Sequence, residues 1–196
     1  MPAALALSMV DEPAHAAVLL KPELRRLVDL LSTPNSAAGL ARDLGWSRQV
    51  VNYHLKELKG AGLIVLKEER KRGNCMERVM QRAAAFYVIN PQTLGSLAAD
   101  PERMPDKFSS AYLVAVAART IKDISRLNRE ADAAGKTLPT LTLETEVRFR
   151  SAQERSAFTA ELTAFTTELV RKYNDSKSPN GRSFRIITAA YPETKK

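Results

Sequence analysis

The segment 36–62 constrains the fold more than any other part of the chain. Apolar residues at helical spacing predict a short helix over 36–44, and Gly45 ends it with the left-handed backbone that glycine tolerates. Ser47 is placed to cap a further helix that reaches Lys59. Two helices joined by the three-residue turn 45–47 predict a helix-turn-helix.

The residues on either side of this segment extend the motif. Pro22 opens an earlier helix with one apolar face, since proline suits a first helical turn. After the motif, Leu63–Glu69 predicts a strand, 70–74 a basic turn and 76–89 a returning strand or pair of strands. We interpret this hairpin as the wing of a winged helix-turn-helix domain.

The helix over 47–59 has two chemically different sides. Val51, Leu55 and Leu58 fall on one side, which we expect to be buried, and polar side chains fall on the other. Asn and Gln can bind adenine in the major groove and Arg can bind guanine, whereas Lys and Tyr suit phosphate oxygens. The alternative interpretation is a solvated polar face. The predicted DNA contacts are Ser47, Arg48, Gln49, Asn52, Tyr53 and Lys56.

Positive charge surrounds the predicted wing. Ten basic and five acidic side chains lie between Arg42 and Arg82, in a chain whose formal net charge is +8. Arg70, Lys71 and Arg72 would follow the DNA backbone or enter a minor groove, where negative potential attracts arginine. An ordinary charged hairpin is the alternative interpretation of this segment.

These residues resemble the ArsR-type winged-helix repressors over 18–89. The resemblance is carried by the runs Leu20-Lys21-Pro22, Leu27–Leu31, Ser36–Ser47 (SAAGLARDLGWS), Val51–Leu58 (VNYHLKEL) and Ala61-Gly62-Leu63-Ile64. It implies a homodimeric, cytoplasmic transcription repressor that binds a pseudo-palindromic double-stranded DNA operator. It also implies an effector, a small molecule or a protein, that changes the affinity for DNA.

The sequence indicates no metal site, cofactor or catalytic centre. The paired cysteines of the family's metal sensors are absent, and His15, His54 and Cys75 lack the spacing of metal ligands. No Ser/His/Asp arrangement or glycine-rich dinucleotide motif occurs. We therefore expect a regulator with no catalytic residues, no bound metal and no cofactor.

The N-terminal segment 1–20 is expected to be a tail or an extra helix. It carries no Lys or Arg before Lys21, unlike a secretion leader, and no apolar run of the chain is long enough to span a bilayer. The single cysteine, Cys75, allows no intrachain disulfide, which fits a reducing compartment. These features agree with a cytoplasmic location and no membrane partner.

The second half is predicted to hold a linker over 91–107, a long helix over 108–135 and a small β-α-β unit over 136–196. In that unit, strands over 141–149 and 183–191 would flank one helix, and the whole could serve as an effector or partner module. The long helix carries an apolar stripe that we expect to form the dimer interface. The stripe residues are Leu113, Ala117, Ile121, Ile124 and Leu127.

The predicted fold class is mainly α with α+β parts, in which a winged helix-turn-helix over 21–90 precedes the long helix and the β-α-β unit. Two other functions remain open at this stage. One is a winged-helix module that binds protein through its basic face. The other is a small-molecule-binding protein with a vestigial DNA domain.

Overall fold

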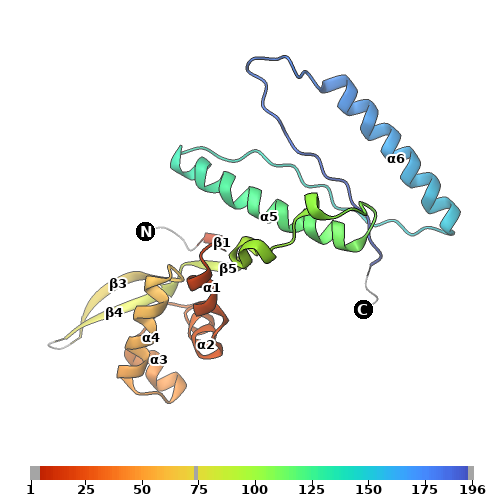
Figure 1. The fold of residues 1–196 in the computed structure, drawn as a ribbon. Helices are drawn as coiled ribbons and strands as arrows, with labels where there is room; N and C mark the ends of the chain where they lie inside the picture. Colours follow the sequence, from red (N-terminus) through yellow and green to blue (C-terminus); the bar gives the residue numbers. More distant parts are fainter. Residues whose placement is uncertain (1–4, 73–74, 194–196) are drawn as a thin grey trace. The chain divides into compact units, whose positions relative to one another are not determined.

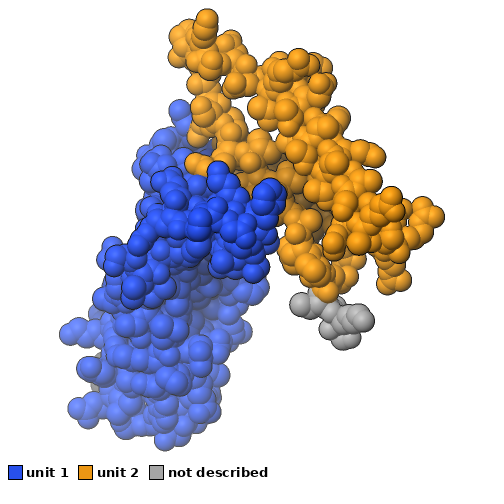
Figure 2. Space-filling view, turned by 45° about the vertical axis from the view of Figure 1, so that its right-hand side comes forward, with its two compact units in different colours: residues 1–138 blue, residues 139–196 orange. Residues whose placement is uncertain are grey.

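The computed structural model of the chain describes residues 5–72 and 75–193. It divides into two compact units, residues 1–138 and residues 139–196, which Figure 2 colours separately. Helices dominate both units, and two small sheets lie in the first. The mixed class predicted from the sequence, mainly α with α+β parts, is confirmed.

The core of the first unit lies among four short helices. Leu24 and Leu27 of one helix pack with Leu40 and Leu58 of two others, and all four side chains are fully buried. Their spacing of three and four residues brings the apolar side chains of each helix onto one side. The helices are α1 (Pro13–Leu20), α2 (Pro22–Leu30), α3 (Ala37–Leu44) and α4 (Arg48–Gly60).

A three-stranded antiparallel sheet forms the predicted hairpin. It consists of β2 (Asn35–Ser36), β4 (Cys75–Arg82) and β3 (Ile64–Arg72), in that order. Figure 1 shows β3 and β4 projecting from the helices as a long ribbon. β3 continues through Arg72, so Arg70 and Lys71 lie on a strand and not in the turn that the sequence predicted. The remainder of that turn, 73–74, is outside the described residues.

The N-terminal segment contains a strand where the sequence predicted a tail or a helix. This strand, β1 (Leu5–Val10), pairs in parallel with β5 (Ala84–Ile89), and α1 follows it. The return segment is therefore divided, because β4 belongs to the hairpin and β5 to a second, two-stranded sheet. Nothing in the local pattern of residues 5–10 identifies a partner so distant along the chain.

The first unit ends in a long helix. Two 3₁₀ segments, η1 (Pro91–Leu97) and η2 (Pro101–Arg103), lead into α5 (Ser110–Ala133), which contacts both of them. Ala115, Ala118 and Ser125 are buried on one side of α5. The stripe that contains Leu113 and Ile124 lies on the opposite side of the helix and remains half-buried or exposed.

The second unit holds one helix, α6 (Ala152–Tyr173), between two segments without regular structure. The strands expected over 141–149 and 183–191 are not formed. None of the residues described between 139 and 193 is buried. The physical reason is that two strands cannot make a stable sheet without further partners. No helix in either described part of the chain is long and apolar enough to cross a membrane.

Candidate nucleic-acid interface

Serine caps and one glycine set the geometry of the turn between α3 and α4. The Ser36 hydroxyl accepts a hydrogen bond from the Gly39 amide at 3.3 Å, and that of Ser47 accepts one from the Val50 amide at 3.2 Å. Gly45 has a φ of 68°, which a side chain would strain. These local contacts orient α4 so that one of its sides packs on the core and the other faces outward.

The two sides of α4 differ as the sequence predicted. Val51, Leu55 and Leu58 are buried in the core. The six residues proposed as DNA contacts are all exposed, and with Lys59 they form one continuous polar surface along the helix, which we call the reading face. Its members are Ser47, Arg48, Gln49, Asn52, Tyr53, Lys56 and Lys59.

Glu57, the one acidic residue of α4, forms an ion pair with a lysine next to α2. Lys21, the residue before α2, donates a hydrogen bond from Nζ to Glu57 Oε1 at 2.6 Å. This bond lowers the pKa of Glu57 below its ordinary value of 4.5 and raises that of Lys21 above 10.5. The reading face is consequently basic and polar, without an acidic side chain to repel phosphate.

The Lys21–Glu57 pair predicts a specific acid sensitivity. Because folding lowers the pKa of Glu57, the pair stabilises the fold above pH 4.5 and loses this contribution as the pH falls through the folded-state pKa. A Glu57→Gln variant should therefore lose less stability than the wild type when the pH falls from about 5 to about 3. Urea denaturation at several pH values measures this. Equal pH slopes for the two proteins would contradict the prediction.

His54 of α4 packs against Trp46, which lies in the turn between α3 and α4. The His54 ring lies 5.8 Å from the Trp46 ring and 5.4 Å from the Tyr53 ring, centroid to centroid. His54 is half-buried. These ring contacts give His54 a packing role within the domain.

The arginines and lysines of the wing have different surroundings. Arg70 donates from Nε to Glu77 Oε2 at 2.9 Å, and Arg78 donates from Nε to Glu69 Oε1 at 3.0 Å. Lys71 is exposed and forms no ion pair within the described part of the chain. Of the two predicted wing contacts whose side chains the structure describes, Arg70 is paired with an acid and Lys71 is not. The side chain of Arg72 is outside the described residues.

Glu77 helps to position the wing, a role that its place in the sequence does not reveal. Its side chain is buried, and besides Arg70 it accepts a hydrogen bond from the Ser36 hydroxyl at 2.6 Å. One carboxylate thereby joins the wing to the cap of α3, and so fixes the wing relative to the reading face. The antiparallel register, in which Glu77 lies opposite Arg70, is the signal that could have revealed it.

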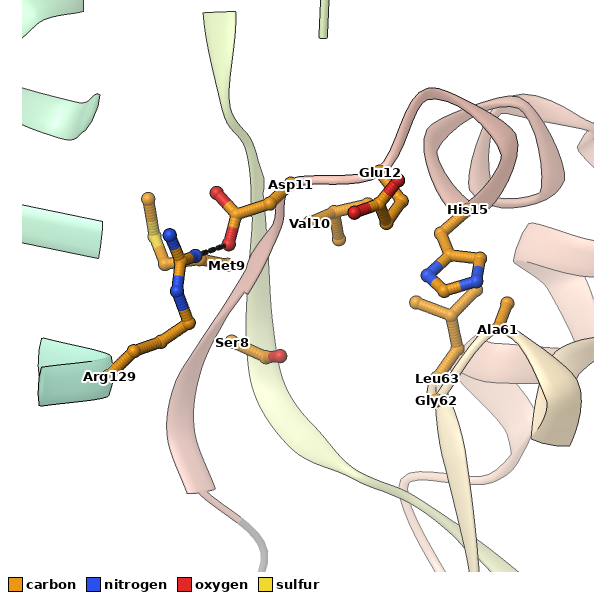
Figure 3. A pocket seen from close by; sticks show the side chains of 10 residues that line it. All are labelled: Ser8, Met9, Val10, Asp11, Glu12, His15, Ala61, Gly62, Leu63 and Arg129. Atoms are coloured by element: carbon orange, nitrogen blue, oxygen red, sulfur yellow. Dashed lines mark hydrogen bonds and ion pairs between the residues drawn. The ribbon is translucent and has the colours of Figure 1, made fainter. Parts of the chain in front are cut away.

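A partly buried polar cluster around Asp11 attaches α5 to the domain. Asp11 accepts hydrogen bonds from Asn90 Nδ2 at 2.6 Å, from Ser125 Oγ at 2.8 Å and from Arg129 Nη1. We call these four residues the Asp11 cluster. Figure 3 shows the Asp11–Arg129 contact at the edge of a cavity of about 440 Å³, which His15 and Glu12 also line.

A helix-turn-helix with an exposed polar second helix and an adjoining β-hairpin defines a winged helix-turn-helix, a class of DNA-binding domain. Residues 19–67 match the model of a helix-turn-helix domain family. The matched region runs from the end of α1 into β3 and covers about a quarter of the 196 residues. No curated protein matches the chain. The domain points to a function of the transcription-regulator type.

Proposed function

We propose that this protein is a non-enzymatic, cytoplasmic transcription regulator that binds a specific DNA sequence, and that it acts as a dimeric repressor of the ArsR type. The observation that carries the proposal is the reading face, which consists of six exposed polar residues on the second helix of the motif and its cap Ser47, with no acid among them. An α-helix of this kind fits the major groove of B-DNA.

Within this proposal the exposed residues divide into two roles. Arg48, Gln49 and Asn52, on the N-terminal half of α4, have side chains that can bind base edges bidentately. Tyr53 and Lys56 suit the phosphate backbone, as do the basic residues of the wing. Base contacts carry sequence preference, whereas phosphate contacts supply affinity that falls with salt.

A homodimer completes the proposal. Two copies would place two reading faces on half-sites about 34–36 Å apart, one helical turn of DNA. The stripe on α5 opposite its buried side is the proposed interface, because its apolar residues are only partly covered by their own chain. The interface residues are Leu113, Ala117, Ile121, Ile124 and Leu127. An effector, a small molecule or a protein, would then change the affinity of this dimer for its operator.

Selection of bound fragments from a genomic DNA library tests the proposal and supplies the operator. A regulator should enrich one sequence, and its affinity should fall steeply with salt because bound counterions are released. A winged-helix module for protein binding, or a vestigial DNA domain, would enrich no sequence. That outcome would overturn the proposal.

Two substitutions then separate reading from phosphate contact. Asn52→Ala should cost about 1–3 kcal/mol at the preferred base and reduce the preference for it, because a bidentate contact is lost. Lys71→Ala should weaken binding to every sequence alike and lower the salt slope by about one. Fluorescence anisotropy against the operator and its single-base variants measures both. Identical, sequence-blind effects of the two changes would contradict the division of roles.

A further inference from the structure

The second unit leaves its apolar side chains in solvent, as far as the structure describes it. Leu141 is 82% exposed and Leu143 is 87% exposed, and α6 contains no buried residue. A segment that alternates apolar and polar residues is expected to be half-buried in a sheet. The segment before α6 therefore has the pattern of a strand but lacks a neighbouring strand in its own chain.

The two sides of this segment are distinct. Phe149 contacts Phe158 of α6, with 5.3 Å between ring centroids, so α6 lies toward the side that carries the odd-numbered residues. The even-numbered residues Glu144, Glu146 and Arg148 fall on the other side and are exposed. No backbone hydrogen bond involving residues 141–149 is found in the described structure. The edges of the segment are open to another strand.

The charges on the exposed side are self-complementary. In an antiparallel pair with a two-fold axis at Val147, residue Glu146 of one copy lies opposite Arg148 of the other. Glu144 lies opposite Arg150, whose guanidinium already binds Glu154 of its own copy at 3.1 Å, so the Glu146–Arg148 positions carry most of the match. Opposite charges in directly facing positions stabilise a strand pair. Every facing position that holds an acid in one copy thus holds a base in the other.

Other registers lose this match. Moving the axis to Glu146 or to Arg148 places two like charges directly opposite each other, which destabilises the pair. A register changed by one residue places polar side chains opposite apolar ones and puts the α6 helices of the two copies on opposite sides of the ribbon. The charge pattern therefore selects one register, and it selects a second copy of this chain as the partner.

We propose that residues 144–150 of two copies pair as antiparallel strands about a two-fold axis at Val147, and that this pairing is an interface of the homodimer. Each copy supplies the strand that the other lacks, and α6 of each copy covers the apolar side of the ribbon. The inference rests on the proposed homodimer but does not require the stripe on α5. It gives the second unit a role in assembly.

Charge reversal with rescue tests the pairing. Glu146→Arg places like charges opposite each other at two symmetric positions, and so does Arg148→Glu. Each change should raise the dissociation constant of the dimer roughly tenfold or more. The double variant Glu146→Arg/Arg148→Glu should restore it, and an equimolar mixture of the two single variants should associate. Sedimentation velocity of the full chain over a concentration series measures all four samples.

Glu161→Arg is the matched control, since Glu161 is exposed on α6 and outside the proposed strand. It should leave the dissociation constant unchanged. Circular dichroism checks that each variant keeps its helices. Wild-type dimerisation in all variants would overturn the strand pairing and leave the homodimer standing, as would weakening without rescue by the double variant. A wild-type chain that stays monomeric would overturn both the strand pairing and the homodimer. Operator binding is a separate test of the proposed regulator function.

Discussion

Replacing Asp11 by alanine is expected to lower the free energy of unfolding of the first unit by about 3–6 kcal/mol. The Asp11 carboxylate accepts hydrogen bonds from two buried groups, and each bond to a charged acceptor contributes about 1.5–3 kcal/mol. Ser125 is 1% exposed and Asn90 is 5% exposed, so two buried donors lose their charged acceptor when the carboxylate is removed. The Arg129 side chain is largely exposed and adds little.

The same change should release α5 from the domain. Asp11 follows β1, Asn90 follows β5 and Ser125 lies in α5, so one side chain joins three elements. Amide hydrogen exchange over 110–133 should accelerate in the Asp11→Ala variant. Urea denaturation and exchange together measure the effect.

Two variants bracket this prediction. Asp11→Asn keeps one carbonyl oxygen as an acceptor and should show an intermediate loss. Arg126→Ala removes an exposed pair with Glu130 on the same helix and should cost less than about 1 kcal/mol. An alanine variant at position 11 that is as stable as the Arg126 control would show that the cluster does not hold α5.

Glu77→Ala should lower stability by about 2–3 kcal/mol and weaken DNA binding, although Glu77 is buried. The Ser36 hydroxyl, itself buried, would lose a hydrogen bond to a charged acceptor. Arg70 would lose its partner at 2.9 Å, and because its side chain is half exposed this adds less. The wing would no longer be joined to the cap of α3, so its basic residues would be less well placed relative to the reading face.

Two control variants distinguish the contribution of the Glu77 side-chain oxygen atoms from that of its charge. Glu77→Gln keeps an oxygen for Ser36 and should retain much of the stability while losing the charge opposite Arg70. Arg78→Ala, which breaks the exposed pair with Glu69, should cost less than about 1 kcal/mol. Thermal unfolding and operator titration measure the three variants. Wild-type stability and affinity in Glu77→Ala would refute the role assigned to this carboxylate.

The helix-turn-helix could be predicted from the sequence because its determinants are local. The caps at Ser36 and Ser47 act within three residues, and Gly45 needs only its own backbone geometry. The burial of Val51 and Leu58 follows from helical spacing. Ser47 and the five α4 residues proposed to contact DNA could be named for the same reason, since the exposed side of an amphipathic helix is the complement of its buried side.

The ends of the chain could not be predicted in this way. The sheet between β1 and β5 joins residues about 80 positions apart, and the pattern of residues 5–10 alone does not name that partner. The strands expected around α6 have the correct alternation but no neighbour in their own chain. A strand becomes stable through its pairing, whereas a helix closes its hydrogen bonds within itself.

Local pattern, then, determined helices α2, α3 and α4, the caps of α3 and α4, and the polarity of α4. The tertiary structure decided which of the charged side chains form pairs within the fold. Arg70 binds Glu77, Lys21 neutralises Glu57, and Asp11 meets Ser125 across 114 residues of sequence. A charge is exposed or paired according to what folding brings beside it, and only the folded chain contains that information.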